Sequence, residues 1–200
     1  MNAKLIYQII EHKNWLESLG RYGQRLILDT ENMCGIHNCY LEILMGAWIK
    51  SCVFNKMCIQ DSDLYYSKLF SCHFVKTNLN EISFSHSLVR DTNFNHSMIS
   101  SVNFYHAEID RCIFRNCKID NVSFKNAIIF DTDFRNTQFN NVNFQQAHLD
   151  NILVNENTKF INCTPCDLSS ITIKIKPKNK ILPLSQKDSM QWIQENILSE

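Results

Sequence analysis

The sequence has little glycine and no excess of charge of either sign. It contains only four glycines in 200 residues, and all of them precede residue 47. A glycine-rich phosphate-binding loop is therefore excluded after that point, and no GxGxxG or Walker pattern occurs anywhere. Twenty basic residues balance twenty acidic ones. This balance argues against a broadly basic nucleic-acid-binding surface and equally against a strongly acidic one.

Long apolar runs are also missing. No stretch reaches the roughly eighteen apolar residues that a membrane span needs. The N-terminus, MNAKLIYQIIEHKNWL, has no long apolar region and soon carries charge, so it does not look like a signal peptide. Nine cysteines are many for 200 residues, but their number is odd and their spacing is not that of a small secreted scaffold. We therefore expect a cytoplasmic protein with reduced, free thiols.

What the sequence does have is a bulky apolar residue at every fifth position. The spacing runs without a gap from Leu44 to Val154, and every member is Leu, Ile, Val or Phe. An α-helix needs spacings of three and four, and a half-buried strand needs a spacing of two, so neither explains the pattern. A fixed period of this kind indicates a repeat architecture.

A second, mostly small residue stands two positions before each bulky one, as Cys112 stands before Phe114. The other three residues of each five are mainly polar. Residues two apart lie on the same side of an extended segment, so each unit directs one large and one small side chain inward. A chain that turns after every five residues and stacks on itself is a solenoid, in which each coil pairs with its neighbours.

This pattern resembles the pentapeptide-repeat family, whose motif is small–polar–Leu/Phe–polar–polar. The segments CHFVKTNLNE, TNFNHSMISS and TDFRNTQFNN match it, and the resemblance covers residues 44–154. It implies an all-β solenoid, a right-handed quadrilateral β-helix with four units per coil. With twenty residues per coil, phenylalanine falls mostly on two facing walls. One wall holds Phe54, Phe74, Phe94, Phe114 and Phe134, and the opposite wall holds Leu64, Phe84, Phe104, Phe124 and Phe144.

We divide the chain into an N-terminal helical cap (1–25), a pentapeptide-repeat β-helix (26–168) and a C-terminal strand with an amphipathic helix (169–200). In the first part, the apolar residues of one expected helical face are Leu5, Ile9, Ile10, Leu16 and Leu19. The segment also resembles a leader found on pentapeptide-repeat proteins, of the type H-x-x-W-L…G…G-x-R. Its matching residues are His12, Trp15, Leu16, Gly20, Gly23 and Arg25.

The C-terminal part begins with ITIKIKP, which alternates and predicts a short strand ending at Pro177. Ser185 and Asp188 are then placed as a capping box for a final helix. That helix either covers the last coil or joins two subunits in a homodimer. The residues expected to form this contact are Met190, Trp192, Ile193 and Ile197.

Residues that could carry chemistry are few. Cys163 and Cys166 form a lone CxxC, and a zinc site would need two more ligands at a suitable spacing, so we favour a degenerate repeat over a metal or redox site. His86 and His106 should lie one coil apart at one corner, but a metal would want a third ligand. No nucleophile elbow, HExxH motif or paired-acid site occurs. We expect no catalytic residues, no metal and no cofactor, and hence no enzyme.

The outer surface remains, and one wall of it carries apolar residues. Phe70, Leu88, Ile128 and Phe130 are expected to point away from the core there, with Arg90 among them. An exposed apolar cluster rimmed by charge often marks a protein-binding site. The wall is therefore our candidate binding surface, although a terminal helix folded over it, or simple tolerance of exposed apolar residues, would also explain the pattern.

These features favour a non-catalytic, bacterial protein-binding module. The resemblance implies self-protection, meaning immunity or antibiotic resistance, by binding a toxin or the target of a toxin. One alternative is a DNA gyrase-protecting protein of the quinolone-resistance type, and another is a secreted effector or scaffold. Imitation of DNA would need a strong negative field. Residues 50–155 contain ten acidic and ten basic residues, so that field is absent. We expect a protein partner, with no direct contact to nucleic acid or membrane.

Overall fold

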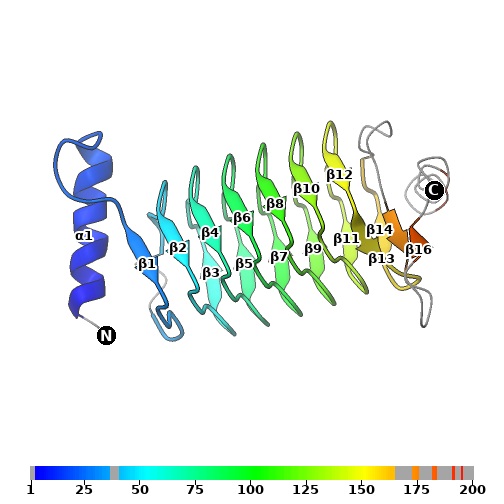
Figure 1. Cartoon of the computed structure of the whole chain (residues 1–200), viewed down its shortest axis with the longest axis horizontal. Coiled ribbons are helices and arrows are strands. Elements are labelled where there is room, and N and C mark those ends of the chain that lie inside the picture. The colour runs from blue at the N-terminus through cyan, green and yellow to red at the C-terminus, as the bar shows by residue number, and fades with distance from the viewer. Residues whose placement is uncertain are drawn as a thin grey trace.

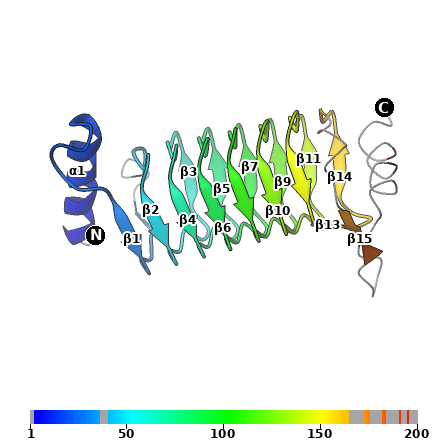
Figure 2. The ribbon, with the colours of Figure 1, turned by 45° about the horizontal axis from the view of Figure 1, so that its top comes forward.

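The chain folds as a parallel β-solenoid with one helix at its N-terminal end (Figure 1). The computed structural model describes residues 3–36 and 41–164, the backbone of 173–175 and 182–183, and residues 191 and 195. Helix α1 (Ala3–Glu17) precedes a stack of three-residue strands, and the two views in Figures 1 and 2 show successive coils lying side by side along one axis.

Two parallel sheets form opposite sides of the solenoid. The first has seven strands, in spatial order β1 (Ile27–Asp29), β2 (Trp48–Lys50), β4 (Lys68–Phe70), β6 (Leu88–Arg90), β8 (Glu108–Asp110), β10 (Ile128–Phe130) and β12 (His148–Asp150). The second has six, in spatial order β3 (Cys58–Gln60), β5 (Asn78–Asn80), β7 (Met98–Ser100), β9 (Lys118–Asp120), β11 (Gln138–Asn140) and β14 (Lys159–Ile161). The expected four-sided β-helix is confirmed, because columns of single parallel bridges form the other two sides.

The interior is filled by side chains that stack on their equivalents in the next coil. The rings on the Phe54–Phe134 wall have centroids 4.6 to 5.2 Å apart. Those on the opposite Phe84–Phe144 wall are 4.9 to 5.3 Å apart. These distances lie in the range of favourable aromatic stacking. The residue at the centre of each regular strand is buried between the two walls, as Ile109 is. Every fifth residue thus occupies the axis of the solenoid.

Several of the small inward residues find partners for the polar atoms that they bury, although the buried Ser67 Oγ has none. Ser97 Oγ donates to the carbonyl oxygen of Phe74 at 2.5 Å, and Thr77 Oγ1 donates to that of Phe54 at 2.9 Å. Cys117 Sγ lies 3.0 Å from the carbonyl oxygen of Phe94. Buried hydroxyl groups are costly only when they lack a partner. Serine and threonine can therefore occupy the same inward positions that hold alanine or valine in other coils.

The corners of the coils have a left-handed backbone. Every fifth residue from Ser51 to Asn151 has a positive φ, between 45° and 61°, and none of them is glycine. Asn, Asp and His tolerate this conformation best among non-glycine residues. They fill 12 of these 21 corners, which explains much of the polar remainder of each repeat.

Helix α1 is held against the first coil by the leader residues. His12 is buried, and its Nδ1 accepts a hydrogen bond from the backbone N–H of Leu26 at 3.0 Å. Burial lowers the pKa of His12, which favours the neutral ring that can accept this bond. A Cβ atom at Gly23 would lie 2.2 Å from the carbonyl oxygen of Glu11, so only glycine lets the chain pass the helix this closely. The leader residues thus fix helix α1 against the first coil.

The prediction of which residues form the apolar face of the helix was partly wrong. Ile10 is 52% exposed, and Leu19 lies beyond the end of α1 and is 89% exposed. The buried side chains are Leu5 and His12, seven residues apart, with Ile9 packed against the core beside them. A histidine takes the place of an aliphatic residue because its ring nitrogen serves the backbone of the first coil.

The regular register ends after Val154, as the sequence predicted. Phe139 pairs with Phe160, which is 21 residues later, whereas earlier coils in this sheet repeat every 20 residues. Strand β13 (Ile152–Val154) then pairs with β15 (Ile173–Ile175), which lies within the expected ITIKIKP strand, and β16 (Leu182–Pro183) adds an antiparallel strand. Gln191 and Glu195 are helical, and their side chains hydrogen bond at 2.8 Å. Met190, Trp192, Ile193 and Ile197 lie outside the described residues.

Removal of one ring from a wall should be costly. Phe104 is fully buried between Phe84 and Phe124, and its replacement by alanine leaves a cavity that stacked neighbours cannot fill. We expect Phe104→Ala to lower the free energy of unfolding by about 3–5 kcal/mol, measured by guanidinium denaturation. The outward-facing Met98→Ala should change it by less than about 0.5 kcal/mol. Similar losses in the two variants would contradict the stacked core.

The corner conformation can be tested at Lys76, whose φ is 57° and whose side chain is exposed. A β-branched residue is strongly disfavoured in this region. We expect Lys76→Val to lower the free energy of unfolding by about 1–2 kcal/mol, whereas Lys76→Asn should leave it unchanged or raise it. Thermal unfolding followed by circular dichroism provides the comparison. Equal stability of the two variants would argue against a left-handed corner.

Candidate functional site

The candidate binding surface is the outer side of the seven-stranded sheet. The register places Leu88 beside Glu108, and Glu108 beside Ile128. A second column runs from Phe70 through Arg90 and Asp110 to Phe130. The structure thus brings Phe70, Leu88, Arg90, Ile128 and Phe130 onto one face, in two adjacent columns along the solenoid axis.

The apolar side chains of this face are only partly accessible. Ile128 is 41% exposed, whereas Phe70, Leu88 and Phe130 are half-buried. The ring of Phe130 meets that of His148 edge to face, with centroids 5.9 Å apart. Neighbouring coils are close enough for each outward side chain to cover part of the next one.

An ionic network crosses the middle of the face. Arg90 Nη2 lies 3.0 Å from Glu108 Oε1, and Arg90 Nε lies 2.9 Å from Asp110 Oδ2. Arg111 continues the network with Nη1 2.7 Å from Asp110 Oδ2 and Nε 2.7 Å from Asp91 Oδ1. The hydrogen bond from Arg111 lowers the pKa of the Asp91 carboxyl. These charges lie between two apolar pairs, Phe70 with Leu88 and Ile128 with Phe130, instead of rimming one apolar cluster as expected.

Asp91 and Arg111 were not among the predicted site residues, although the sequence carries a signal for them. They are separated by 20 residues, as are Arg90 and Asp110. Because one coil contains 20 residues, this separation stacks opposite charges directly on one another. A search for opposite charges one coil apart would have found both pairs.

The histidines at the corner stack on each other and form no evident metal site. The rings of His86 and His106 are 5.1 Å apart and nearly parallel. Asn126 Nδ2 lies 3.4 Å from His106 Nε2. Among the residues that the structure describes, no three His, Cys, Asp or Glu side chains are grouped so that they could hold a metal ion.

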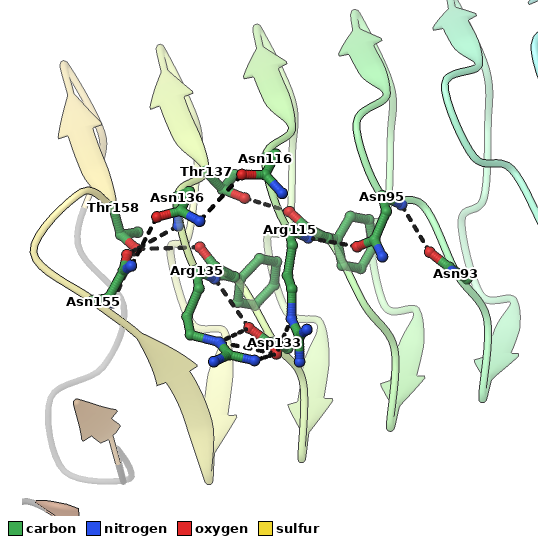
Figure 3. Close-up of polar contacts among 12 residues, drawn as sticks. Asn93, Asn95, Arg115, Asn116, Asp133, Arg135, Asn136, Thr137, Asn155 and Thr158 are labelled. Carbon is green, nitrogen blue, oxygen red and sulfur yellow. Dashed lines mark hydrogen bonds and ion pairs between the residues drawn. The ribbon is translucent and has the colours of Figure 1, made fainter. Parts of the chain in front are cut away.

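A second polar cluster lies on a bridge-forming side of the solenoid (Figure 3). The carboxylate of Asp133 is buried between two guanidinium groups, with Oδ2 2.5 Å from Arg115 Nε and 2.7 Å from Arg135 Nη2. Burial would raise the pKa of Asp133, but hydrogen bonds from Arg135 and Arg115 hold it below its usual value. Asn136 Nδ2 donates to Asn116 Oδ1 in the same view, at 3.1 Å. These side chains join successive coils.

The comparisons with known proteins agree with this geometry. A family model described as a pentapeptide repeat region matches residues 90–174. The period of five and the four-sided coils extend the same architecture back to the first strands. Residues 90–174 thus match the family that the sequence resembles. The β-solenoid that this resemblance implies is present along the described coils. No curated protein matches the chain significantly.

Several solved structures resemble this chain at low identity. QnrB1, described as a plasmid-mediated fluoroquinolone resistance protein, is 12% identical over 76% of this chain and 90% of its own, with a TM-score of 0.44. HetL, described as involved in heterocyst differentiation regulation in the cyanobacterium Nostoc, is 11% identical over 85% and 97%, with a TM-score of 0.32. A pentapeptide repeat protein of the Arabidopsis thaliana thylakoid lumen is 14% identical over 70% and 76%, with a TM-score of 0.33.

The environment of each cysteine depends on whether its position in the coil is inward or outward. All seven cysteines within the described residues are free. Burial raises the pKa of Cys72, Cys112 and Cys117 to about 12, and it also raises the pKa of Cys163. Cys166, its CxxC partner in the sequence, lies outside the described residues. A buried thiol of raised pKa acts as a small apolar residue.

No helix within the described residues is long and apolar enough to cross a membrane. The expected dimer contact of the C-terminal segment falls outside these residues and stays a prediction.

The thiol environments predict selective modification of the native protein. Cys34 and Cys58 are exposed, so iodoacetamide near pH 8 should alkylate them within minutes. Cys72, Cys112 and Cys117 should stay unmodified until denaturant is added, because their pKa of about 12 keeps them protonated and the coils cover them. Peptide mass spectrometry assigns each site. Rapid labelling of Cys112 in the native protein would contradict a closed interior.

Proposed function

We propose that the protein is a non-catalytic protein-binding module that serves bacterial self-protection, as an immunity or resistance factor, by binding a toxin or the target of a toxin. Binding takes place on the outer side of the seven-stranded sheet. The proposal needs no cofactor and assigns no residue a catalytic role.

The filled interior carries the proposal. An interior space between the first coils measures about 10 Å³, which is close to the minimum for a single water molecule. Small-molecule and catalytic sites are usually clefts of several hundred cubic ångströms with converging polar groups. Stacked side chains fill the axis of the described coils, and we therefore place the binding chemistry on the outside.

The outer face has the composition of a recognition surface. It combines two apolar pairs, Phe70 with Leu88 and Ile128 with Phe130, with charges that the Arg90 network holds in fixed positions. Its side chains stand on paired strands, so their positions are set before a partner arrives. Preformed surfaces lose little conformational entropy on binding. Fixed charges between apolar groups favour a partner with matching charges.

The self-protection role rests on the resemblance to immunity and resistance members of the family. Protection of gyrase through imitation of DNA is the weaker alternative, because a DNA mimic needs a continuous negative field. On this face, Arg90 and Arg111 lie directly against Glu108, Asp110 and Asp91 and oppose their charge. A role as a secreted effector or scaffold has no observation in its favour.

Charges placed on the apolar pairs should abolish partner binding. We expect the double variant Leu88→Glu and Phe130→Glu to weaken binding of the cellular partner at least tenfold, because each carboxylate would be desolvated at the interface. Affinity capture followed by titration with the purified partner provides the measurement.

Met98→Glu supplies the matched control, since Met98 is 56% exposed on the opposite sheet. It should bind as the unmodified protein does. Circular dichroism must show an intact β-solenoid in every variant. If the double variant binds as tightly as the control, the outer side of the seven-stranded sheet is not the binding surface.

A further inference from the structure

A groove lies between helix α1 and the first coils, at the N-terminal end of the seven-stranded sheet. Its volume is about 430 Å³, and aromatic and basic side chains dominate its lining: Trp15, Arg25, Trp48, Tyr65, Tyr66 and Lys68. Trp15 comes from the helix, Trp48 and Lys68 come from β2 and β4, and the two tyrosines come from the corner before β4. None of its lining residues is acidic.

A glycine makes the groove hollow. The backbone N–H of Gly46 donates to the carbonyl oxygen of Tyr65 at 2.7 Å, which sets the first corner directly on the second. The second corner carries the side chain of Tyr66, 20 residues after Gly46, and the first carries none. A Cβ at Gly46 would lie 3.7 Å from the ring of Trp15. The indole therefore borders the space that a corner side chain occupies in later coils.

The two basic groups of the groove lie over indole rings. The Arg25 guanidinium carbon is 4.7 Å from the ring centroid of Trp15 and 5.3 Å from that of Trp48. Lys68 Nζ is 5.0 Å from the ring centroid of Trp48. Within the described part of the chain, neither Arg25 nor Lys68 forms an ion pair with a carboxylate. A ring holds a cation in place without neutralising it, so the groove is positive in a chain of zero net charge.

The aromatic lining continues along the corner beyond the groove. Tyr66 is 57% exposed, and its ring stacks on that of His86 at 5.1 Å. His86 in turn stacks on His106 at 5.1 Å. An extended ligand could therefore follow this row of rings, whereas a small molecule would use only the groove.

Exposed apolar groups concentrate at the same end of the molecule. Among the described residues, eleven large apolar side chains are exposed, and eight of them precede residue 67: Tyr7, Ile10, Leu19, Tyr22, Ile27, Ile43, Trp48 and Tyr66. Trp, Tyr and Arg are also the residues that contribute most to protein–protein binding. This end of the solenoid therefore has the composition of a binding hot spot.

We propose that the groove binds an acidic segment of the protein partner. A carboxylate of that segment lies between Arg25 and Lys68, and a neighbouring apolar side chain enters the hollow at Gly46. This inference rests on the proposed function, because it names the contact that anchors the same partner at the end of the same sheet.

The charge distribution favours a peptide over a nucleic acid. Single-stranded nucleic acids need basic groups that follow the backbone as well as rings that stack on bases. The row from Tyr66 through His86 to His106 carries no lysine or arginine, so only the groove supplies permanent positive charge. One or two carboxylates match that arrangement.

A random dodecapeptide phage library panned on the full-length protein tests the proposal. We expect the enriched peptides to share an Asp or Glu within two residues of a large apolar side chain. The synthetic form of the leading peptide should change the tryptophan fluorescence, and its Kd should rise at least tenfold in Lys68→Glu and in Gly46→Tyr. The second variant fills the hollow with the side chain that the next corner carries at a similar φ, 54° at Tyr66 against 69° at Gly46.

Lys118→Glu makes the same charge change on the opposite sheet and should leave the Kd unchanged. Absence of enrichment, enrichment of basic or uncharged peptides, or an unchanged Kd in Lys68→Glu would overturn the proposal. Two further results would overturn the proposal in favour of another ligand. If the protein binds an oligothymidylate and Lys68→Glu abolishes that binding, the groove is a nucleic-acid site. If light scattering shows self-association and Gly46→Tyr abolishes it, the groove is a contact between copies of the chain.

The proposal about the groove and the proposal about the outer face can be refuted independently of each other. Retention of the cellular partner by Lys68→Glu and Gly46→Tyr, with its loss in the Leu88→Glu and Phe130→Glu double variant, would refute the groove alone. The reverse result would retain the groove and refute the outer face as the main contact.

Discussion

The whole structure depends on one contact, the stacking of each inward side chain on its equivalent one coil away. In the regular part of the stack, equivalent residues are 20 positions apart, and a left-handed corner recurs at every fifth residue. Non-glycine residues adopt that conformation at a cost of roughly 1–2 kcal/mol each. Stacked rings 4.6 to 5.3 Å apart, together with hydrogen bonds from most corners to the next coil, offset this cost. The absence of glycine after residue 46 is therefore compatible with more than twenty left-handed corners.

The same stacking leaves only the outward side chains free to contact other molecules. Because the axis is filled, a residue can meet a partner only from one of the outward positions, and each outward position is repeated one coil later. Side chains 20 residues apart thus become neighbours, as Asp91 and Arg111 do. The surface consists of columns, and its character depends on which residue types follow one another within a column. Alternating charge neutralises a column, which explains why a chain with forty charged residues presents no strong field here.

The sequence allowed the repeated part of the fold to be predicted, and the irregular part only incompletely. The period of five placed Phe104 between Phe84 and Phe124 correctly, because inward residues stack on their equivalents one coil away. It also placed Phe70 and Phe130 on one face, but it could not show that Arg90 would form ion pairs with two carboxylates between them. Helical spacing failed at Ile10, since it ranks residues by hydropathy and gives no weight to the hydrogen bond that buries His12. The groove escaped prediction because it arises from a missing side chain at Gly46.

Irregularity is what distinguishes one part of a solenoid from another. A perfect repeat gives every coil the same shape, so a partner could bind in several registers along it. At the N-terminal end, the helix, the docking of Trp15 and the empty corner at Gly46 break this equivalence and create a concave site next to a regular face. A partner held there by one anchor can then align its remaining contacts with the columns of the sheet in a single register. A partner that binds both the groove and the face, as we propose, would have its position and its direction along the rod fixed by the two contacts together.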